Sequence, residues 1–269
     1  MPPPAKRTDL LSHCTAFWKC NDNAFSNVVL DAVGAHNGTM VGTHASPPPF
    51  TYTSMFHEEP DNPPYMNGYF NLQKFGADAH FSVAAGLLPS NLVEHSFVIW
   101  AKAAAGYAER ANDILLYCYN DANNYIRLYQ SSGSWIWGYE SSSGASQASV
   151  DVTGGWDCLI FGRNRLYDKA FISVNGGAFD YGDEKVNATS GLNAKTLYIG
   201  SDGTGNYFQG FIDCISYYAA YSIGELSGIA DEDKWLYNDG DGTEKLRQPV
   251  RPKVGGDSRA TLIGGALCR

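Results

Sequence analysis

Residues 196–235 read TLYIGSDGTGNYFQGFIDCISYYAAYSIGELSGIADEDKW. Residues 197–200 and 207–218 within them are dense in Ile, Phe and Tyr, and a turn rich in Gly, Asp and Asn separates the two segments. Branched and aromatic side chains favour extended backbone, and turn residues of this kind mark the ends of strands. The stretch therefore predicts two consecutive β-strands.

A short helix is expected directly after the second of these strands. Ser222 is a good N-cap residue, and Glu225 stands three positions later, which is the spacing of a capping box. The helix is expected to cover residues 223–237 and to bury its apolar side chains against the strands.

The composition favours an all-β protein with many turns. Of the 269 residues, 13% are aromatic, 29 are glycine and only 17% are charged. The net charge of −9 argues against a nucleic-acid partner, because binding phosphates requires clustered Lys and Arg. The chain contains no run of about 18 apolar residues, so no membrane span is predicted. The amino-terminal segment also lacks the apolar core of a signal peptide.

The cysteines are predicted to be free thiols. Cys14 and Cys20 lie in one predicted strand, where about 20 Å would separate them, far beyond disulfide reach. Cys118, Cys158 and Cys214 lie in other apolar segments, where a thiol behaves as a small core residue. A cross-strand disulfide is the alternative.

A series of short strands fills the middle of the chain. Residues 94–103, EHSFVIWAKA, are apolar on both faces, which predicts a strand that is covered on both sides. Asn175-Gly176 is a hairpin turn signal, and the proline-rich residues 45–64 predict a long surface loop. Further strands are predicted at residues 12–20, 68–73, 79–83, 114–119, 125–130, 134–139, 148–152, 156–162 and 168–174.

Several short motifs resemble those of laminin-G-like domains, which are concanavalin A-like β-sandwiches. In these domains the first strand is followed by an Asp, a glycine-rich turn and an Asn-Gly-Thr triplet, and a central strand carries spaced Phe, Ile and Trp. A later Gly-x-Ile-Asp motif is also similar to the sequence here. The matching positions are Asp31, Gly34, Asn37, Gly38, Thr39, Phe97, Ile99, Trp100, Gly210 and Asp213.

This resemblance implies a single all-β jelly-roll sandwich over residues 11–242, with one short C-terminal helix. Residues 1–10 are then a flexible Pro-rich arm, and residues 243–269 form a C-terminal extension. The resemblance also implies a structural Ca²⁺, which needs oxygen ligands. Its ligands are expected among Asp31, Asn37, Asp78 and Asp213. For Asp213 the alternative is that its side chain caps a β-bulge.

Two aromatic rows are candidates for a glycan-binding groove. Trp135, Trp137 and Tyr139 share one face of a predicted strand, and Tyr125 and Tyr129 share a face of its neighbour. Flat rings stack on the apolar faces of sugars, and nearby amides bond the hydroxyl groups. The alternative is that these rings form the core of the sandwich, with any binding site in the loops at one end.

No catalytic signature is present in the sequence. Glucanases on this sandwich use a strand-borne Glu-x-Asp-x-x-Glu, which does not occur in the chain. Lyase-type sites need a Tyr with His and Arg or Gln on neighbouring strands, whereas the six histidines fall mostly in loops or at strand ends. We therefore expect a protein that is not an enzyme, with glycoside hydrolase or polysaccharide lyase as the alternative.

The organisation of the chain resembles that of phage virion components. The expected role is that of a virion structural, decoration or appendage protein, located in the virion. Its partners would be capsid or tail proteins, copies of itself and surface glycans. The alternative is a free, extracellular carbohydrate-binding lectin or adhesion module.

Overall fold

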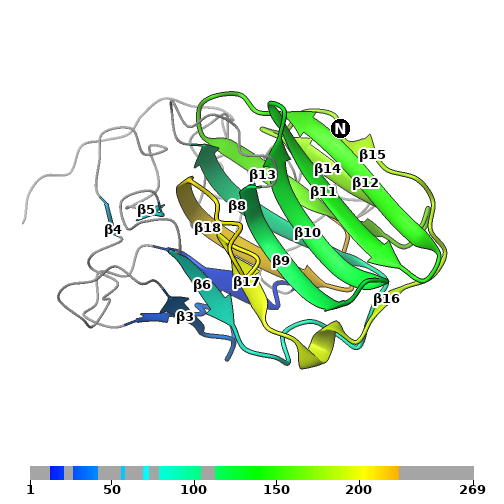
Figure 1. The fold of residues 1–269 in the computed structure, drawn as a ribbon, viewed down its shortest axis with the longest axis horizontal. Coiled ribbons are helices and arrows are strands. Elements are labelled where there is room, and N and C mark those ends of the chain that lie inside the picture. Colours follow the sequence, from blue (N-terminus) through cyan, green and yellow to red (C-terminus); the bar gives the residue numbers. More distant parts are fainter. Residues whose placement is uncertain are drawn as a thin grey trace, which may run out of the picture.

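Two large antiparallel sheets pack face to face in the computed structural model of the chain (Figure 1). The predicted arm, C-terminal extension and Asp78 lie outside the described residues, as does the predicted helix beyond Ile223. No helix long and apolar enough to cross a membrane occurs in the part of the chain that the structure describes. The described residues are 13–20, 27–41, 56–57, 69–72, 79–103 and 113–223.

The first sheet, here called the β8 sheet, has the strand order β15-β14-β13-β8-β18-β5-β4, and β1 also pairs with β18. All of its neighbouring strands run antiparallel. The strands are β1 (Ala16–Trp18), β4 (Phe56–His57), β5 (Tyr69–Asn71), β8 (His95–Ala103), β13 (Asp157–Asn164), β14 (Lys169–Val174), β15 (Asp180–Tyr181) and β18 (Gly210–Ala219).

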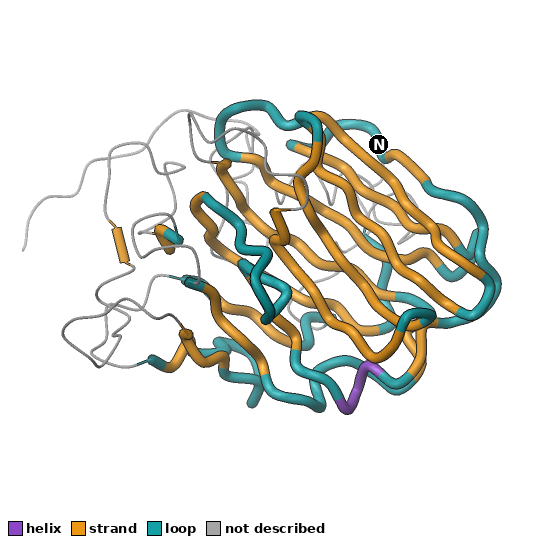
Figure 2. The backbone as a smooth tube through the Cα atoms, viewed as in Figure 1, coloured by secondary structure: helices purple, strands orange, loops and turns teal. Residues whose placement is uncertain are grey.

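The second sheet, here called the β10 sheet, has the order β12-β11-β10-β9-β17-β6-β3-β2 and lies in front of the β8 sheet in Figure 1. A small third sheet pairs β7 (Asn91–Leu92) with β16 (Thr189–Ser190), followed by a 3₁₀ turn at Leu192–Ala194, purple in Figure 2. The strands of the β10 sheet are β2 (Val28–Val29), β3 (Gly38–Val41), β6 (His80–Val83), β9 (Asp113–Asp121), β10 (Asn124–Ser131), β11 (Ser134–Ser141), β12 (Gly144–Asp151) and β17 (Leu197–Ile199).

The all-β fold is confirmed, and the predicted strands overlap observed ones. The strand predicted at 12–20 is shorter, β1 (Ala16–Trp18), and the one predicted at 148–152 begins earlier, at Gly144. The strands β9 to β12 form the expected meander of consecutive antiparallel neighbours. The turn signal at Asn175-Gly176 is also confirmed, because both residues have positive φ angles, of 53° and 66°. The two strands predicted within residues 196–235 do not pair with each other, since β17 belongs to the β10 sheet and β18 to the β8 sheet.

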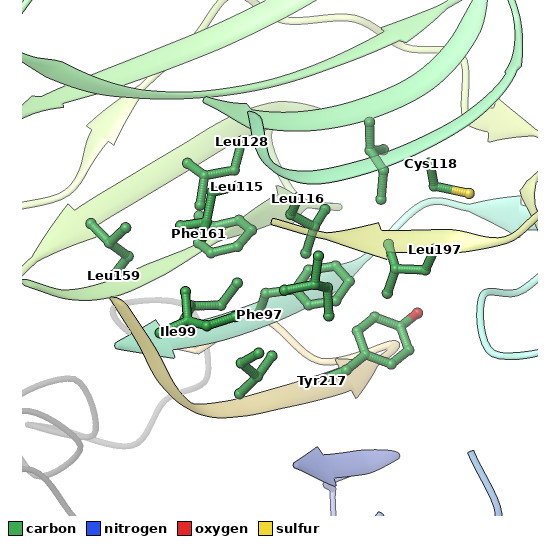
Figure 3. Packing of buried hydrophobic residues seen from close by; sticks show 14 of the residues in the cluster. Phe97, Ile99, Leu115, Leu116, Cys118, Leu128, Leu159, Phe161, Leu197 and Tyr217 are labelled. Carbon is green, nitrogen blue, oxygen red and sulfur yellow. The ribbon is translucent and has the colours of Figure 1, made fainter. Parts of the chain in front are cut away.

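The core lies between the two sheets. Figure 3 shows Leu116 and Leu128 of the β10 sheet near Phe97 and Phe161 of the β8 sheet, and the rings of Phe97 and Phe161 stack at 5.5 Å. On the other face of β8, Trp100 belongs to a second buried apolar cluster. The prediction that this strand is covered on both sides is therefore confirmed.

The five cysteines that the structure describes are free and buried, as predicted. Burial, with the nearby charge of Asp31, raises the pKa of the Cys14 thiol to about 12. Burial likewise raises the pKa of Cys118 to about 12. Both thiols are therefore protonated and unreactive at neutral pH, so they act as packing residues.

Candidate functional site

The row of aromatic rings on β11 faces the core. Trp135, Trp137 and Tyr139 are each at most 1% exposed and belong to the cluster between the sheets. A sugar cannot reach these rings in the folded protein. The structure therefore corrects the prediction of a glycan-binding groove at these three positions in favour of the core alternative.

Hydrogen bonds across the sandwich explain why such polar rings are buried. The indole of Trp135 donates to Asp157 Oδ2 at 2.8 Å, and the indole of Trp137 donates to the carbonyl of Gly162 at 2.7 Å. Both acceptors lie on β13, in the opposite sheet. A buried indole N–H needs such a partner, so these bonds tie the two sheets together at fixed positions.

Tyr125 and Tyr129 lie on the opposite, outward face of the β10 sheet. They alternate along β10 with Ile126 and Leu128, which are fully buried in the core. The prediction that the two tyrosines share a face is therefore confirmed. That face is turned away from the core, while the tryptophans of β11 point into it.

More tyrosines extend this outward face onto the neighbouring strands. Tyr117 pairs in register with Arg127 on one side and with Tyr198 on the other. Tyr119 is 45% exposed, and its ring lies 6.0 Å from that of Tyr117. We call this surface the tyrosine face, and it comprises Tyr117, Tyr119, Tyr125, Arg127 and Tyr198. Tyr129 lies on the same side of β10 but is only 7% exposed, so the structure corrects its prediction as a glycan-binding residue.

Arg127 lies in the middle of the tyrosine face. Its guanidinium carbon is 4.5 Å from the ring centre of Tyr129 and 5.6 Å from that of Tyr125. Tyr125 in turn lies 6.3 Å from Tyr119, and its hydroxyl is 3.5 Å from Glu140 Oε2. The rings and the guanidinium thus form one continuous surface, since neighbouring groups are in cation–π or ring contact.

The hydroxyls of Tyr117 and Tyr125 keep their protons at neutral pH. Burial, and then the neighbouring Tyr119, Asp202 and Tyr125, raise the pKa of Tyr117 to about 12. Burial also raises the pKa of Tyr125, although Arg127 opposes this shift. These two phenols are therefore neutral hydrogen-bond donors and acceptors for a bound molecule.

A polar loop forms one border of the tyrosine face. A Cβ atom added at Gly203 would come within 2.7 Å of the Tyr198 ring, so this loop packs against that ring. Asp202 holds the loop closed by accepting hydrogen bonds from the backbone N–H groups of Thr204, Gly205 and Asn206. Burial opposes ionisation of Asp202, but these bonds and the Asn206 side chain lower its pKa to about 2.

His80 lies on β6 beyond the tyrosines, where it is buried, with 7% of the residue exposed. Its ring lies 5.9 Å from Tyr198 and 6.1 Å from Tyr207. His80 and Arg127 lie on strands separated by β17 and β9, so the two strands are about 14 Å apart, three strand spacings. The two side chains do not converge on one point, as the lyase-type arrangement would require.

Sequence reasoning missed most of the tyrosine face. The sequence predicts strands at Tyr117, Tyr119 and Tyr198 but no binding site there. The available signal was the alternation of Tyr117 and Tyr119 with the apolar Leu116 and Cys118. The approach of Tyr198 was not visible, because β17 and β9 are far apart in the sequence.

Two of the expected calcium ligands, Asp31 and Asn37, take part in a hydrogen-bond network beside β1. The carboxylate of Asp31 accepts from the backbone N–H groups of Phe17 (2.9 Å), Val33 (3.0 Å) and His36 (3.1 Å). The backbone N–H of Asp31 donates to Asn37 Oδ1 at 2.9 Å. These bonds fix the turn-rich segment against β1, which gives the Asp, turn and Asn-Gly-Thr motif a structural role.

Asp213 is fully buried at a bulge in β18. The register with β8 shifts between Asp213 and Ser216, and Cys214 has a φ of 39°. Asp213 Oδ1 accepts a hydrogen bond from the Cys214 N–H at 2.7 Å, as the bulge-capping alternative requires. No group of three or more His, Cys, Asp or Glu side chains suited to a metal ion is present among the described residues.

Comparison with known proteins gives the fold but no family. No family model and no curated protein matches the chain. Among solved structures, domain 4 of AbnA, a GH43 extracellular arabinanase from Geobacillus stearothermophilus, in complex with arabinotriose, is 17% identical. The match covers 81% of this chain and 98% of that domain, with a TM-score of 0.55.

Botulinum neurotoxin binding domains are also similar in structure. The neurotoxin DC domain, solved in complex with rat synaptotagmin II, has a TM-score of 0.61 at 11% identity, and the match covers 85% of this chain and 52% of that one. The serotype D domain has a TM-score of 0.59 at 13% identity, with 87% and 53% covered. The chain thus spans about half the length of these toxin domains. At such identities the likeness shows a shared β-sandwich fold.

Proposed function

We propose that this protein is a non-catalytic module that binds glycans on the tyrosine face. The observation that carries the proposal is the continuous surface of tyrosine rings on the outward side of β9, β10 and β17. Sugars present flat C–H faces that stack on such rings, and their hydroxyl groups bond neutral phenols. The solved GH43 domain in complex with arabinotriose supports the proposal by analogy of fold.

The tyrosine face suits binding better than hydrolysis or elimination. Both reactions need acid and base groups that converge on one bond. The lyase-type pair His80 and Arg127 is divided by two strands. Two carboxylates beside the rings are already in use: Glu140 contacts the hydroxyl of Tyr125, and Asp202 accepts hydrogen bonds from backbone amides of its own loop.

A glycan array tests the proposal. We expect the intact chain to bind a defined set of glycans, and the double variant Tyr119→Ala/Tyr198→Ala to lose this binding while still showing a cooperative melting transition. Tyr167→Ala is the matched control, because Tyr167 is 50% exposed but lies in the turn between β13 and β14. Binding that survives the double variant would place the site elsewhere, for example in the loops at one end of the sandwich.

The virion role is a second part of the proposal. In this role the sandwich would face the host or the medium, and the terminal segments would anchor it to capsid or tail proteins. Light scattering on the intact chain and on chains lacking residues 1–10 or 243–269 tests this. A symmetric oligomer that depends on these segments supports the virion role. A monomer that does not change on truncation favours the free, extracellular lectin.

A further inference from the structure

Arg127 has an unusual environment for a surface arginine. It is half-buried on β10, between the rings of Tyr125 and Tyr129. Within the described residues it makes no hydrogen bond and no ion pair, and its Nε atom is shielded from solvent without a partner. An arginine that served only to stabilise the sheet would be expected to pair its donors with carboxylate or carbonyl groups.

The residues paired with Arg127 on the two neighbouring strands carry no charge. Its register partner on β11 is Gly138, which has no side chain, and its partner on β9 is Tyr117. Beyond Gly138, the exposed Gln147 of β12 lies over the glycine, since a Cβ added there would come within 2.9 Å of Gln147 Cγ. A guanidinium and a side-chain amide therefore lie in one row across the sheet, next to the stacking surface.

Neither nearby carboxylate forms an ion pair with Arg127 within the described residues. The Asp202 carboxylate is held by three backbone amides of its own loop, and Glu140 contacts the hydroxyl of Tyr125. The stacked rings also hold the arginine side chain in place, so little conformational entropy is lost when its donors are used. A planar guanidinium fixed in this way matches the geometry of a carboxylate or a sulfate ester.

We propose that Arg127 makes the tyrosine face selective for acidic glycans, in which a carboxylate or sulfate group binds the guanidinium while the sugar rings stack on the tyrosines. This inference rests on the proposed glycan-binding function. The protein as a whole repels an anionic ligand, because its net charge is −9. Binding of an acidic glycan therefore needs a specific cation at the site, and Arg127 is placed to be that cation.

Matched pairs of probes test the inference on the intact chain. One pair is an oligogalacturonate and its methyl ester, which keeps the sugar rings and removes the charge. A second pair is a sulfated galactan oligosaccharide and its desulfated form, and the two pairs separate carboxylate from sulfate recognition. We expect the acidic member of at least one pair to bind at least tenfold more tightly than its neutral counterpart.

Three variants assign the selectivity to Arg127. Arg127→Gln is expected to remove the preference for the acidic probe, and Arg127→Lys to retain part of it, because lysine keeps the charge but loses the bidentate fork. Arg165→Gln is the control, since it removes the same charge from an exposed turn residue outside the tyrosine face. Melting temperatures establish that each variant is folded.

The outcomes separate this inference from the proposed function. Equal binding of acidic and neutral probes, lost in Tyr119→Ala, would overturn the role of Arg127 and leave glycan binding intact. An acid preference that persists in Arg127→Gln, or that is lost equally in Arg165→Gln, would also overturn it. Failure of every glycan on the array and of every probe to bind would overturn both proposals.

Discussion

Trp135 donates its indole N–H to the carboxylate of Asp157 across 2.8 Å in the interior of the sandwich. The same carboxylate also accepts from the hydroxyl of Thr153 and the side-chain amide of Asn175. We expect Trp135→Ala to lower the free energy of unfolding by about 3–5 kcal/mol, because it removes a fully buried ring and leaves Asp157 without one donor. Chemical denaturation measures this loss. A Trp135→Ala protein of wild-type stability would show that the ring is not in the core.

The buried side chain of His95 should make the stability of the protein depend on pH. Its ring is fully buried between Phe97 and Trp137, and neither ring nitrogen has a hydrogen-bond partner in the described part of the chain. Burial, and then the neighbouring charge of Arg163, lower the pKa of His95 to about 3. The unfolded chain, with a histidine pKa of about 6.5, therefore takes up a proton at a pH where the folded protein does not.

The stability contributed by neutral His95 is thus present above about pH 6.5 and is lost as the pH falls toward 3. Between pH 7 and pH 5 this group alone should cost about 2 kcal/mol. We expect the free energy of unfolding of His95→Leu to fall by about 2 kcal/mol less than that of the wild type between pH 7 and pH 5. Urea denaturation of both proteins at each pH measures this difference. An identical pH dependence for the wild type and the variant would contradict the role given to His95.

Gly162 allows β8 and β13 to approach closely. A Cβ added there would lie 2.0 Å from the carbonyl oxygen of His95 and 2.9 Å from its carbonyl carbon, and neither backbone atom can move away without breaking the strand pairing. We expect Gly162→Ala to destabilise the protein by about 3 kcal/mol or more. Gly155→Ala is the control, because its Cβ would meet only Thr153 Oγ1 at 3.8 Å. Similar melting temperatures for the two variants would contradict the predicted difference.

Asp31 is expected to act through hydrogen bonds rather than through a metal. Its carboxylate accepts three backbone N–H bonds, which use most of the positions where a cation would bind. We expect Asp31→Ala to cost about 2–4 kcal/mol in stability, because three amide groups lose their acceptor. Removing calcium with EDTA should leave the wild-type melting temperature unchanged. A clear drop on chelation, absent in Asp31→Ala, would instead support the calcium site predicted from the sequence.

The sequence predicted the strands well and the site poorly, for physical reasons. Alternation shows which residues share a face, as it did for Tyr125 and Tyr129, but it does not show which face is inside when both are aromatic. For Trp135 and Trp137 the deciding feature is the pair of acceptors on β13 across the sandwich, which the local sequence does not reveal. Tyr198 joins Tyr117 through pairing between strands that are distant in the chain, and no local pattern encodes such pairing.

The central claim, that the tyrosine face binds glycans, is tested most directly by the dissociation constant of a glycan identified on the array. Calorimetric titration of the wild type, Tyr119→Ala and Tyr167→Ala gives this constant for two tyrosines of similar exposure in different places. We predict binding that is about tenfold weaker for Tyr119→Ala, a loss of about 1.4 kcal/mol, and unchanged for Tyr167→Ala. Unchanged binding in Tyr119→Ala together with a loss in Tyr167→Ala would contradict the account.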